Sequence, residues 1–267
     1  MSVEPTSLPK VRGRLRHGEP LSRFSWFKVG GPAAVLFQPA DCADLQQFLV
    51  TLQSTVPVTV LGVGSNVLVR DGGLEQIVVR TPGALASATV ERNQLIVEAG
   101  VLDQRVAQLA LRAGLSGLEF MIGIPGTVGG AVRMNAGAFG GETAERLVWA
   151  EGLDQDGNLH RLIAAELNFS YRSSALPEGL IVVRAAFALV EGDTASIANR
   201  MRQIKEERAD AQPLGVATGG STFKNQPGHR AWQLIDEAGC RGLRRGQAMV
   251  SEKHCNFLVN LGEATAA

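Results

Sequence analysis

The sequence is poor in cysteine, and its charges cancel. Its 267 residues include three cysteines, Cys42, Cys240 and Cys255, and no two of them form a Cys-x-x-Cys pair. This spacing argues against a disulfide framework and against a zinc site. The 26 basic and 26 acidic side chains leave no excess of positive charge, such as nucleic acids or anionic membrane surfaces attract. We therefore expect no bound metal and no nucleic-acid partner.

Long hydrophobic runs are also absent. No apolar stretch approaches the 18 residues that a membrane-spanning helix needs, and residues 1–13 lack the hydrophobic centre of a signal peptide. We expect a cytoplasmic monomer that does not insert into membranes. The chain is long enough for two domains, or for one large domain with a small appendage, around a substantial core.

Glycine, in contrast, is abundant and concentrated. Residues 121–141 hold seven glycines and one proline among small apolar residues, and Arg133 is their only charge. Because glycine allows backbone N–H groups to approach a ligand closely, this stretch predicts a loop that wraps a phosphorylated cofactor, with Asn135 as a cap. The alternative is a buried glycine-rich turn of a sheet. A second glycine cluster upstream makes that alternative less favourable.

The second cluster, Gly62-Val63-Gly64-Ser65-Asn66, follows a β-branched run at 58–61, and residues 67–69 again have strand character. A dinucleotide fingerprint needs Gly-x-Gly-x-x-Gly at the start of a helix, and a Walker loop needs Gly-Lys-Ser/Thr. Neither pattern is completed here. The remaining interpretation is a strand-loop-strand anion nest in which Ser65 and Asn66 donate hydrogen bonds to phosphate oxygens.

Strands and helices are mixed along the chain without a strict βαβ alternation, which indicates an α+β protein. Helices are predicted from Asp41 to about residue 52, over 102–113, and over 194–212, with Asp41 and Thr194 as N-caps. After Pro213 the composition shifts toward glycine, which suggests a boundary to a smaller C-terminal domain with a helix over 231–238 and a strand over 256–260. The predicted strands cover residues 34–38, 58–61, 77–80, 88–91, 94–98, 147–153, 158–162 and 180–190.

Two polar motifs carry residues suited to chemistry. Arg172, beside the only tyrosine, Tyr171, could pair bidentately with a carboxylate, although a surface arginine is the alternative. In the motif at 219–225, Lys224 and Asn225 suit phosphate or sugar recognition, unless this is only a glycine-rich surface turn. Because no Gly-x-Ser-x-Gly is present, Ser221 is better suited to donate a proton than to act as a hydrolase nucleophile.

Five motifs occur in the order found in the UDP-N-acetylenolpyruvoylglucosamine reductase (MurB) family, which the chain resembles from about Leu21 onward. They lie at 62–66, at 123–130 with 135–138, at 171–174, at 220–225 and at 250–254. No long tyrosine-bearing loop occurs between Arg172 and Leu180, which places the chain near the loop-lacking second type of the family.

The resemblance implies an α+β fold with a two-part FAD-binding domain of the vanillyl-alcohol-oxidase type and a smaller α+β substrate-binding domain. The two FAD-binding subdomains would cover residues 1–83 and 84–212, and the substrate domain residues 213–267. It also implies a UDP-N-acetylmuramate dehydrogenase of peptidoglycan precursor synthesis. NADPH would reduce bound FAD, which passes a hydride from N5 to the enolpyruvyl double bond of UDP-N-acetylglucosamine enolpyruvate and gives UDP-N-acetylmuramate.

Site residues follow from the matching motifs. The resemblance implies that Arg172 polarises the enolpyruvyl carboxylate and that Ser221 protonates the enol-like intermediate. The positions implied for cofactor binding are Gly62, Gly64, Ser65, Asn66, Gly123, Ile124, Pro125, Gly126, Gly129, Gly130, Asn135, Ala136 and Gly137. Those implied for substrate binding are Tyr171, Lys205, Arg208, Lys224, Asn225 and His254.

The chain departs from the family pattern at two places. Gln226 stands where proline is usual, and the sequence ends at Ala267, before the strand that bears a catalytic glutamate in the family. We therefore expect the chain as given to lack full turnover. Two other interpretations are another flavin oxidase or dehydrogenase on the same fold, and a catalytically incompetent protein that binds FAD or a UDP-sugar.

Overall fold

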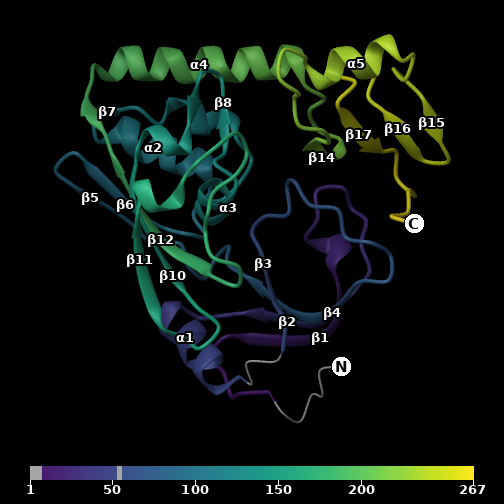
Figure 1. The fold of residues 1–267 in the computed structure, drawn as a ribbon. Helices are drawn as coiled ribbons and strands as arrows, with labels where there is room; N and C mark the ends of the chain where they lie inside the picture. Colours follow the sequence, from purple (N-terminus) through teal and green to yellow (C-terminus); the bar gives the residue numbers. More distant parts are fainter. Residues whose placement is uncertain (1–7, 53–55) are drawn as a thin grey trace.

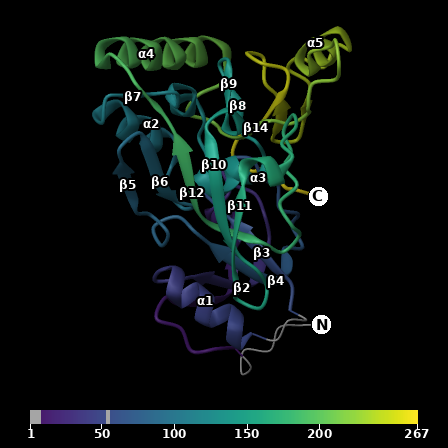
Figure 2. The same ribbon diagram turned by 60° about the vertical axis from the view of Figure 1, so that its left-hand side comes forward.

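The computed structural model describes residues 8–52 and 56–267. Three sheets of four or five strands organise this part of the chain, beside two two-stranded sheets (Figure 1). One lies near the N-terminus, a larger one carries several helices, and a smaller one near the C-terminus follows the long helix α4 (Thr194–Ala211). Figure 2, turned by 60°, shows the same separation of the small C-terminal part from the two larger sheets.

The first sheet has the order β1-β2-β4-β3, formed by β1 (Arg14–Pro20), β2 (Pro32–Gln38), β4 (Leu74–Arg80) and β3 (Val58–Leu61). β1 is antiparallel to β2, and the other neighbours are parallel. Helix α1 (Cys42–Thr51) begins as predicted, because the Asp41 carboxylate accepts the N–H of Asp44. Its apolar face packs on the sheet, with the rings of Phe37 and Phe48 4.3 Å apart between centroids.

The second sheet is antiparallel and has the order β11-β10-β12-β6-β5. Its strands are β5 (Ala88–Glu91), β6 (Gln94–Glu98), β10 (Leu147–Leu153), β11 (Leu159–Ile163) and β12 (Ile181–Ala188). Helix α3 (Val128–Arg133) packs on β12 and β6, while α2 (Asp103–Arg112) packs on α4. One hydrophobic core joins this sheet to the first, and it includes Phe37 and Ile77 together with Leu95 and Phe187.

The C-terminal sheet has the order β14-β17-β16-β15, from β14 (Ala217–Ser221), β17 (Phe257–Asn260), β16 (Ala248–Val250) and β15 (Arg244–Arg245), and carries α5 (Ala231–Glu237). Side chains dock it on the other parts: Asn260 Nδ2 donates to Phe27 O at 2.8 Å, and the Lys253 ammonium donates to Ala209 O at the end of α4. The remaining elements are short: η2 (Leu21–Arg23), β7 (Leu115–Ser116), η3 (Glu119–Gly123), β8 (Gly137–Ala138), β9 (Gly141–Glu142), η4 (Thr143–Glu145), η5 (Ala164–Leu167) and β13 (Val190–Glu191).

Three local predictions were wrong. Residues 67–69 do not return to a strand; they belong to an irregular segment in which Leu68 is exposed, and β4 begins only at Leu74. The N-cap of α4 is Asp193, not Thr194, because the Asp193 carboxylate accepts the N–H of Ser196. The strand predicted over 180–190 breaks after Ala188, and Val190 and Glu191 pair with β7 instead.

Two features that the described residues lack bear on function. None of their helices is long and apolar enough to cross a membrane. They also contain no group of three or more histidine, cysteine, aspartate or glutamate side chains arranged to hold a metal ion.

Candidate active site

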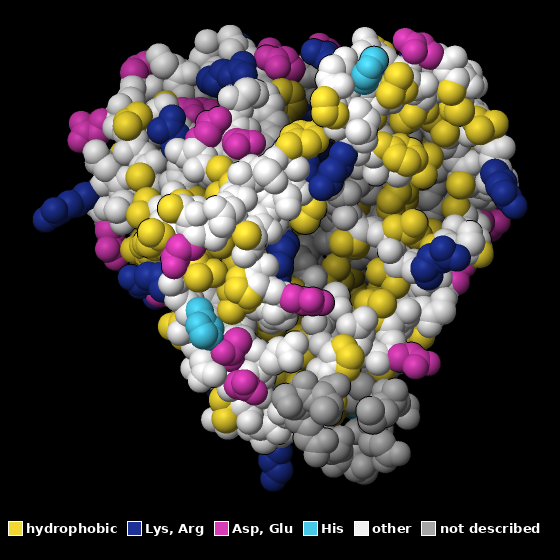
Figure 3. All heavy atoms as spheres, viewed as in Figure 1, with side chains coloured by type: hydrophobic (Ala, Val, Ile, Leu, Met, Phe, Trp, Pro, Cys, Tyr) yellow, Lys and Arg dark blue, Asp and Glu magenta, His cyan; other side chains and the backbone are white. Residues whose placement is uncertain are grey.

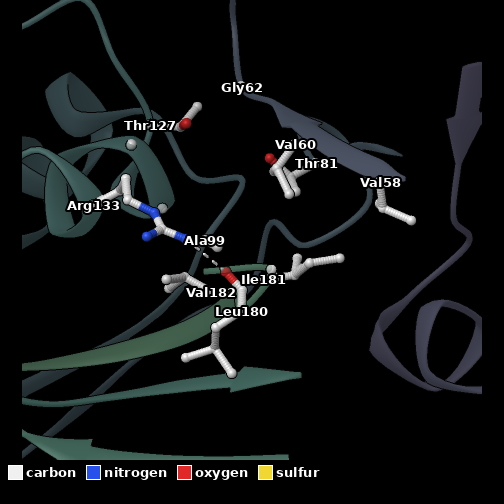
Figure 4. A pocket seen from close by; sticks show the side chains of 13 residues that line it. Val58, Val60, Gly62, Thr81, Ala99, Thr127, Arg133, Leu180, Ile181 and Val182 are labelled. Carbon is white, nitrogen blue, oxygen red and sulfur yellow. Dashed lines mark hydrogen bonds between the residues drawn. The ribbon is translucent and has the colours of Figure 1, made fainter. Parts of the chain in front are cut away.

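The two glycine-rich segments face each other across a pocket of about 220 Å³ (Figure 4). Gly62 lies on one side, the start of α3 lies on the other, and residues 179–182 form a wall. A Cβ on Gly62 would stand 2.5 Å from Thr127 Oγ1, closer than carbon and oxygen can approach without displacement. The close contact of the two segments therefore requires glycine at position 62.

The donors around the glycine turn fit a phosphorylated dinucleotide. Within the described residues, the amides of Gly62 to Asn66 donate no backbone hydrogen bond to the protein. The Ser25 hydroxyl, buried beside Gly64, also lacks a protein partner there. A pyrophosphate would accept hydrogen bonds from such donors. Without a partner, a buried donor destabilises the fold by its desolvation free energy. Sequence reasoning did not single out Ser25, because only the fold brings it beside a turn about forty residues away.

Arg133, at the end of α3, lines the same pocket and is half-buried. Its guanidinium donates to the carbonyl oxygens of Leu176 at 3.0 Å, Pro177 at 3.2 Å and Leu180 at 3.1 Å. Burial lowers the pKa of Arg133, and the nearby Glu178 carboxylate partly opposes that shift. Figure 4 shows the guanidinium pointing toward Leu180 at the pocket wall. The sequence marked Arg133 as the one charge of its stretch but gave it no role.

A buried carboxyl supports the second glycine segment from behind. Asp103, the first residue of α2, is completely buried, and neither carboxyl oxygen has a hydrogen-bond partner among the described residues. Its backbone N–H donates to Gly126 O at 3.1 Å, and a Cβ on Gly126 would stand 2.5 Å from Asp103 Oδ2. Burial raises the pKa of Asp103 well above its ordinary value of 3.8.

This burial predicts a pH-dependent stability for Asp103→Asn. A carboxyl whose pKa is higher in the folded than in the unfolded state stabilises the fold fully at low pH, and that contribution is lost as pH rises toward the folded-state pKa. Asparagine has the same shape and does not ionise. The variant should therefore gain melting temperature relative to the parent as pH rises from the unfolded-state pKa of Asp103 toward its higher folded-state pKa, by roughly 2–4 °C for each kcal/mol of stability gained. Thermal melts at several pH values test this, and a difference that is constant with pH would contradict it.

Asn135 is also completely buried within the glycine-rich stretch. Its Nδ2 donates to Ser170 O at 3.0 Å, and its Oδ1 accepts the N–H of Ala144 at 3.0 Å. The side-chain amide thus connects the stretch to the segment that carries Tyr171 and Arg172. Its contact with a cofactor stays a prediction.

Tyr171 and Arg172 form the corner of a tight turn. Ser170 and Ser173 exchange two backbone hydrogen bonds of 3.1 Å around them, and Arg172 adopts a left-handed backbone with φ of 55°. Its Nη2 donates to Gly137 O at 2.6 Å. The turn therefore brings the predicted catalytic arginine against the predicted cofactor-binding stretch.

The motif of the C-terminal domain meets the same turn. Lys224 Nζ donates to Arg172 O at 3.2 Å, and the N–H of Asn225 donates to the Tyr171 hydroxyl at 3.5 Å. Ser221 is exposed at the end of β14. Figure 3 shows a hollow on this face of the molecule, with apolar side chains gathered over the C-terminal domain.

Asn256, which sequence reasoning missed, fixes this motif. Its side chain exchanges hydrogen bonds with the backbone of Phe223, at 2.8 Å from Nδ2 and 2.9 Å to Oδ1. His254 lies behind it: its Nδ1 accepts the N–H of Asn256 at 3.3 Å, and its ring meets the edge of Phe257 at 4.8 Å between centroids. Burial lowers the pKa of His254.

The two predicted substrate residues of α4 lie in different surroundings. Lys205 is exposed, whereas Arg208 is half-buried and donates to the carbonyl oxygen of Gly123 in the glycine-rich stretch. Burial lowers the pKa of Arg208. Arg208 thus contacts the glycine-rich stretch, and a role for either residue in substrate binding stays a prediction.

Comparison with known proteins places this site in a family. Residues 33–163 match the FAD binding domain model, and residues 212–267 match the model of the UDP-N-acetylenolpyruvoylglucosamine reductase C-terminal domain. The UDP-N-acetylenolpyruvoylglucosamine reductase of Acidiphilium cryptum is 52% identical over 261 residues, which cover 98% of this chain and 84% of that protein. The chain belongs to the UDP-N-acetylenolpyruvoylglucosamine reductase family.

Other relatives agree with this UDP-N-acetylenolpyruvoylglucosamine reductase assignment. The enzyme of Paramagnetospirillum magneticum is 54% identical, over 97% of this chain and 85% of its own length. The crystal structure of the reductase from Thermus caldophilus superposes with a TM-score of 0.85 at 42% identity, covering 95% of this chain and 91% of that one. A 6-hydroxy-D-nicotine oxidase from Arthrobacter nicotinovorans shares the fold alone, at 16% identity and a TM-score of 0.53 over 68% of this chain and 43% of its own.

Membership in the reductase family confirms several predictions. The α+β fold with an FAD-binding domain and a smaller C-terminal domain is confirmed, as are the FAD cofactor, the use of NADPH and the enzyme class. The chain is a flavin oxidoreductase of peptidoglycan precursor synthesis. The division at residues 83 and 212 and the individual site residues stay predictions.

Proposed function

We propose that this chain reduces the enolpyruvyl group of UDP-N-acetylglucosamine enolpyruvate, with Arg172 and Ser221 as its catalytic residues. The observation that carries the proposal is the meeting of three segments: Arg172 contacts Gly137 of the glycine-rich stretch, and Lys224 of the C-terminal domain contacts Arg172. A molecule held along the glycine segments would thus present one end to both predicted catalytic residues.

The chain's residues suggest how the cofactor lies. Bound FAD supplies the hydride for the reaction. We assign its pyrophosphate to the amides of residues 62–66 and to the Ser25 hydroxyl, which lack protein partners in the described part of the chain. The pocket lined by Gly62, Thr127 and Arg133 would then take the adenosine end of FAD, because the isoalloxazine end must face Arg172. We also propose residues 1–83 and 84–212 as the two FAD-binding subdomains and residues 213–267 as the substrate domain.

The residue types suit the charge changes of the reaction. Addition of hydride to the enolpyruvyl double bond develops negative charge on the adjacent carbon and its carboxylate. The Arg172 guanidinium offers a permanent charge and a planar pair of donors to that carboxylate. Ser221 can deliver a proton to the carbon, and we assign the substrate phosphates to Lys224 and Asn225, which contact the Arg172 turn.

One anaerobic experiment tests the reaction. The purified chain should show a flavin visible spectrum that NADPH bleaches and that UDP-N-acetylglucosamine enolpyruvate restores, with UDP-N-acetylmuramate as product. Flavin absorbance that the substrate cannot restore would favour a protein that only binds the cofactor. A preparation that takes up no FAD would end the proposal.

Gly62→Ala should weaken FAD binding, because its methyl group would stand 2.5 Å from the buried Thr127 hydroxyl and push the two glycine segments apart. We expect a dissociation constant for FAD raised about 10-fold or more, corresponding to roughly 1.4 kcal/mol. Flavin fluorescence titration of the apoprotein measures this.

Two variants sharpen the Gly62→Ala test. Gly72→Ala is the matched control, since a Cβ there meets nothing within 4 Å and the residue needs no positive φ. Adding Thr127→Ala to Gly62→Ala removes the clashing hydroxyl and should recover part of the affinity. Equal FAD affinity in Gly62→Ala and Gly72→Ala would show that the approach of the two segments does not matter.

A further inference from the structure

The segment over residues 168–180 connects η5 to β12 and contains no helix or strand of its own. It carries Tyr171 and Arg172 near one end and the pocket wall, Leu180, at the other. Two of its residues, Asn168 and Arg172, adopt left-handed backbones with φ of 37° and 55°. Asparagine adopts that region readily, whereas an arginine there is strained and persists only where the surroundings hold it.

Contacts with the glycine-rich stretch hold this segment along its length. At the catalytic end, Asn135 Nδ2 donates to Ser170 O and Arg172 Nη2 donates to Gly137 O. In the middle, the Ser174 hydroxyl donates to the carbonyl oxygen of Arg133 at 2.8 Å. At the pocket end, the Arg133 guanidinium binds three carbonyl oxygens between positions 176 and 180.

Arg133 makes the largest share of these contacts. Its planar guanidinium can serve several carbonyl oxygens at once, and a lysine ammonium cannot reproduce that geometry. The three partners are neutral, so the positive charge stays uncompensated by them at the wall of the pocket.

We propose that Arg133 is a positioning residue that fixes the 168–180 segment against the glycine-rich stretch and so couples the cofactor pocket to the placement of Arg172. This inference rests on the proposed function. Loss of Arg133 should loosen the pocket wall and the Arg172 turn together, because both belong to one segment. Occupancy of the pocket and binding of the substrate carboxylate should then strengthen each other, since each favours the same arrangement.

Arg133→Met tests the coupling. We expect the dissociation constant for FAD to rise about 10- to 100-fold through the loss of charged hydrogen bonds. At saturating FAD, we expect the rate constant for reoxidation by the enolpyruvyl substrate to fall about 10-fold, because Arg172 is less well oriented. Arg133→Lys should recover part of both effects. Arg112→Met, which removes an exposed arginine at the end of α2, should change neither.

A second measurement needs no cofactor. Amide hydrogen exchange of the full apoprotein should show faster exchange over 168–180 in Arg133→Met than in the parent, with Ser174→Ala shifting in the same direction by less. Unchanged exchange over that segment would overturn the proposal. So would weaker FAD binding with an unaltered reoxidation rate at saturating FAD, since the pocket and Arg172 would then be independent. Failure of the parent protein itself to take up FAD would instead count against the proposed function.

Discussion

Replacing Ser221 with alanine is expected to slow reoxidation of the reduced flavin by the enolpyruvyl substrate about 10²- to 10⁴-fold, the range typical of a positioned proton donor. Ser221 lies at the exposed end of β14, on the motif that contacts the Arg172 turn through Lys224. Reduction by NADPH should continue, because hydride arrival at the flavin does not need this proton. Stopped-flow absorbance separates the two half-reactions.

The control for this variant is Ser87→Ala, which removes an exposed serine hydroxyl beside the larger sheet. Ser221→Cys keeps a proton on the side chain and should recover part of the lost rate. If Ser221→Ala reoxidises as fast as the parent, the proton must come from another group and Ser221 leaves the mechanism.

Arg172→Lys is expected to lower kcat/KM for the enolpyruvyl substrate about 10²- to 10³-fold, the usual cost of losing a preorganised donor to developing charge. Lysine keeps the charge but loses the two parallel donors and the bond to Gly137 O. Steady-state kinetics with saturating NADPH measure the change.

A substrate ester makes the Arg172 test specific. With the enolpyruvyl carboxylate esterified, the parent and Arg172→Lys should differ much less, because no anionic carboxylate remains to be paired. Arg161→Lys, which alters an arginine paired with Glu151 on the larger sheet, serves as the control for general effects. A full difference that persists with the ester would exclude carboxylate pairing as the role of Arg172.

Local sequence rules predicted much of this fold. Asp41 was identified as an N-cap because its carboxylate and the N–H of Asp44 that it accepts lie within four residues. Most strands were identified from short apolar runs. The same rules misplaced the cap of α4, since Asp193 and Thr194 are both good caps and only the structure decides between them. Residues 67–69 have the composition of a strand. However, Arg70 O accepts the N–H groups of Gly73 and Gly31, and the resulting turn prevents a strand from continuing through this position.

The site was predicted where its residues lie in contiguous motifs and missed where single side chains act across the chain. Glycine clusters indicated the two segments that we propose to bind the cofactor, because close approach of the backbone requires glycine and so shows in the composition. Asn256 and Arg133 left no such mark: Asn256 supports Phe223 33 positions away, and Arg133 binds carbonyls 43 to 47 positions away. Backbone carbonyl partners are common to every residue type, so no pattern of side chains could have predicted these contacts.

The hydrophobic core that runs from the first sheet into the second limits where the chain can be divided or recombined with a relative. Phe37 and Phe48 of the N-terminal part share that core with Leu95 and Phe187, while the buried residues of the C-terminal sheet, such as Phe257 and Val259, lie outside it. A cut at the proposed boundary near residue 83 would therefore divide this core, and we expect either half alone to expose an apolar face and to aggregate. A chimaera between two family members would have to inherit both halves from one parent and could take its C-terminal sheet from the other.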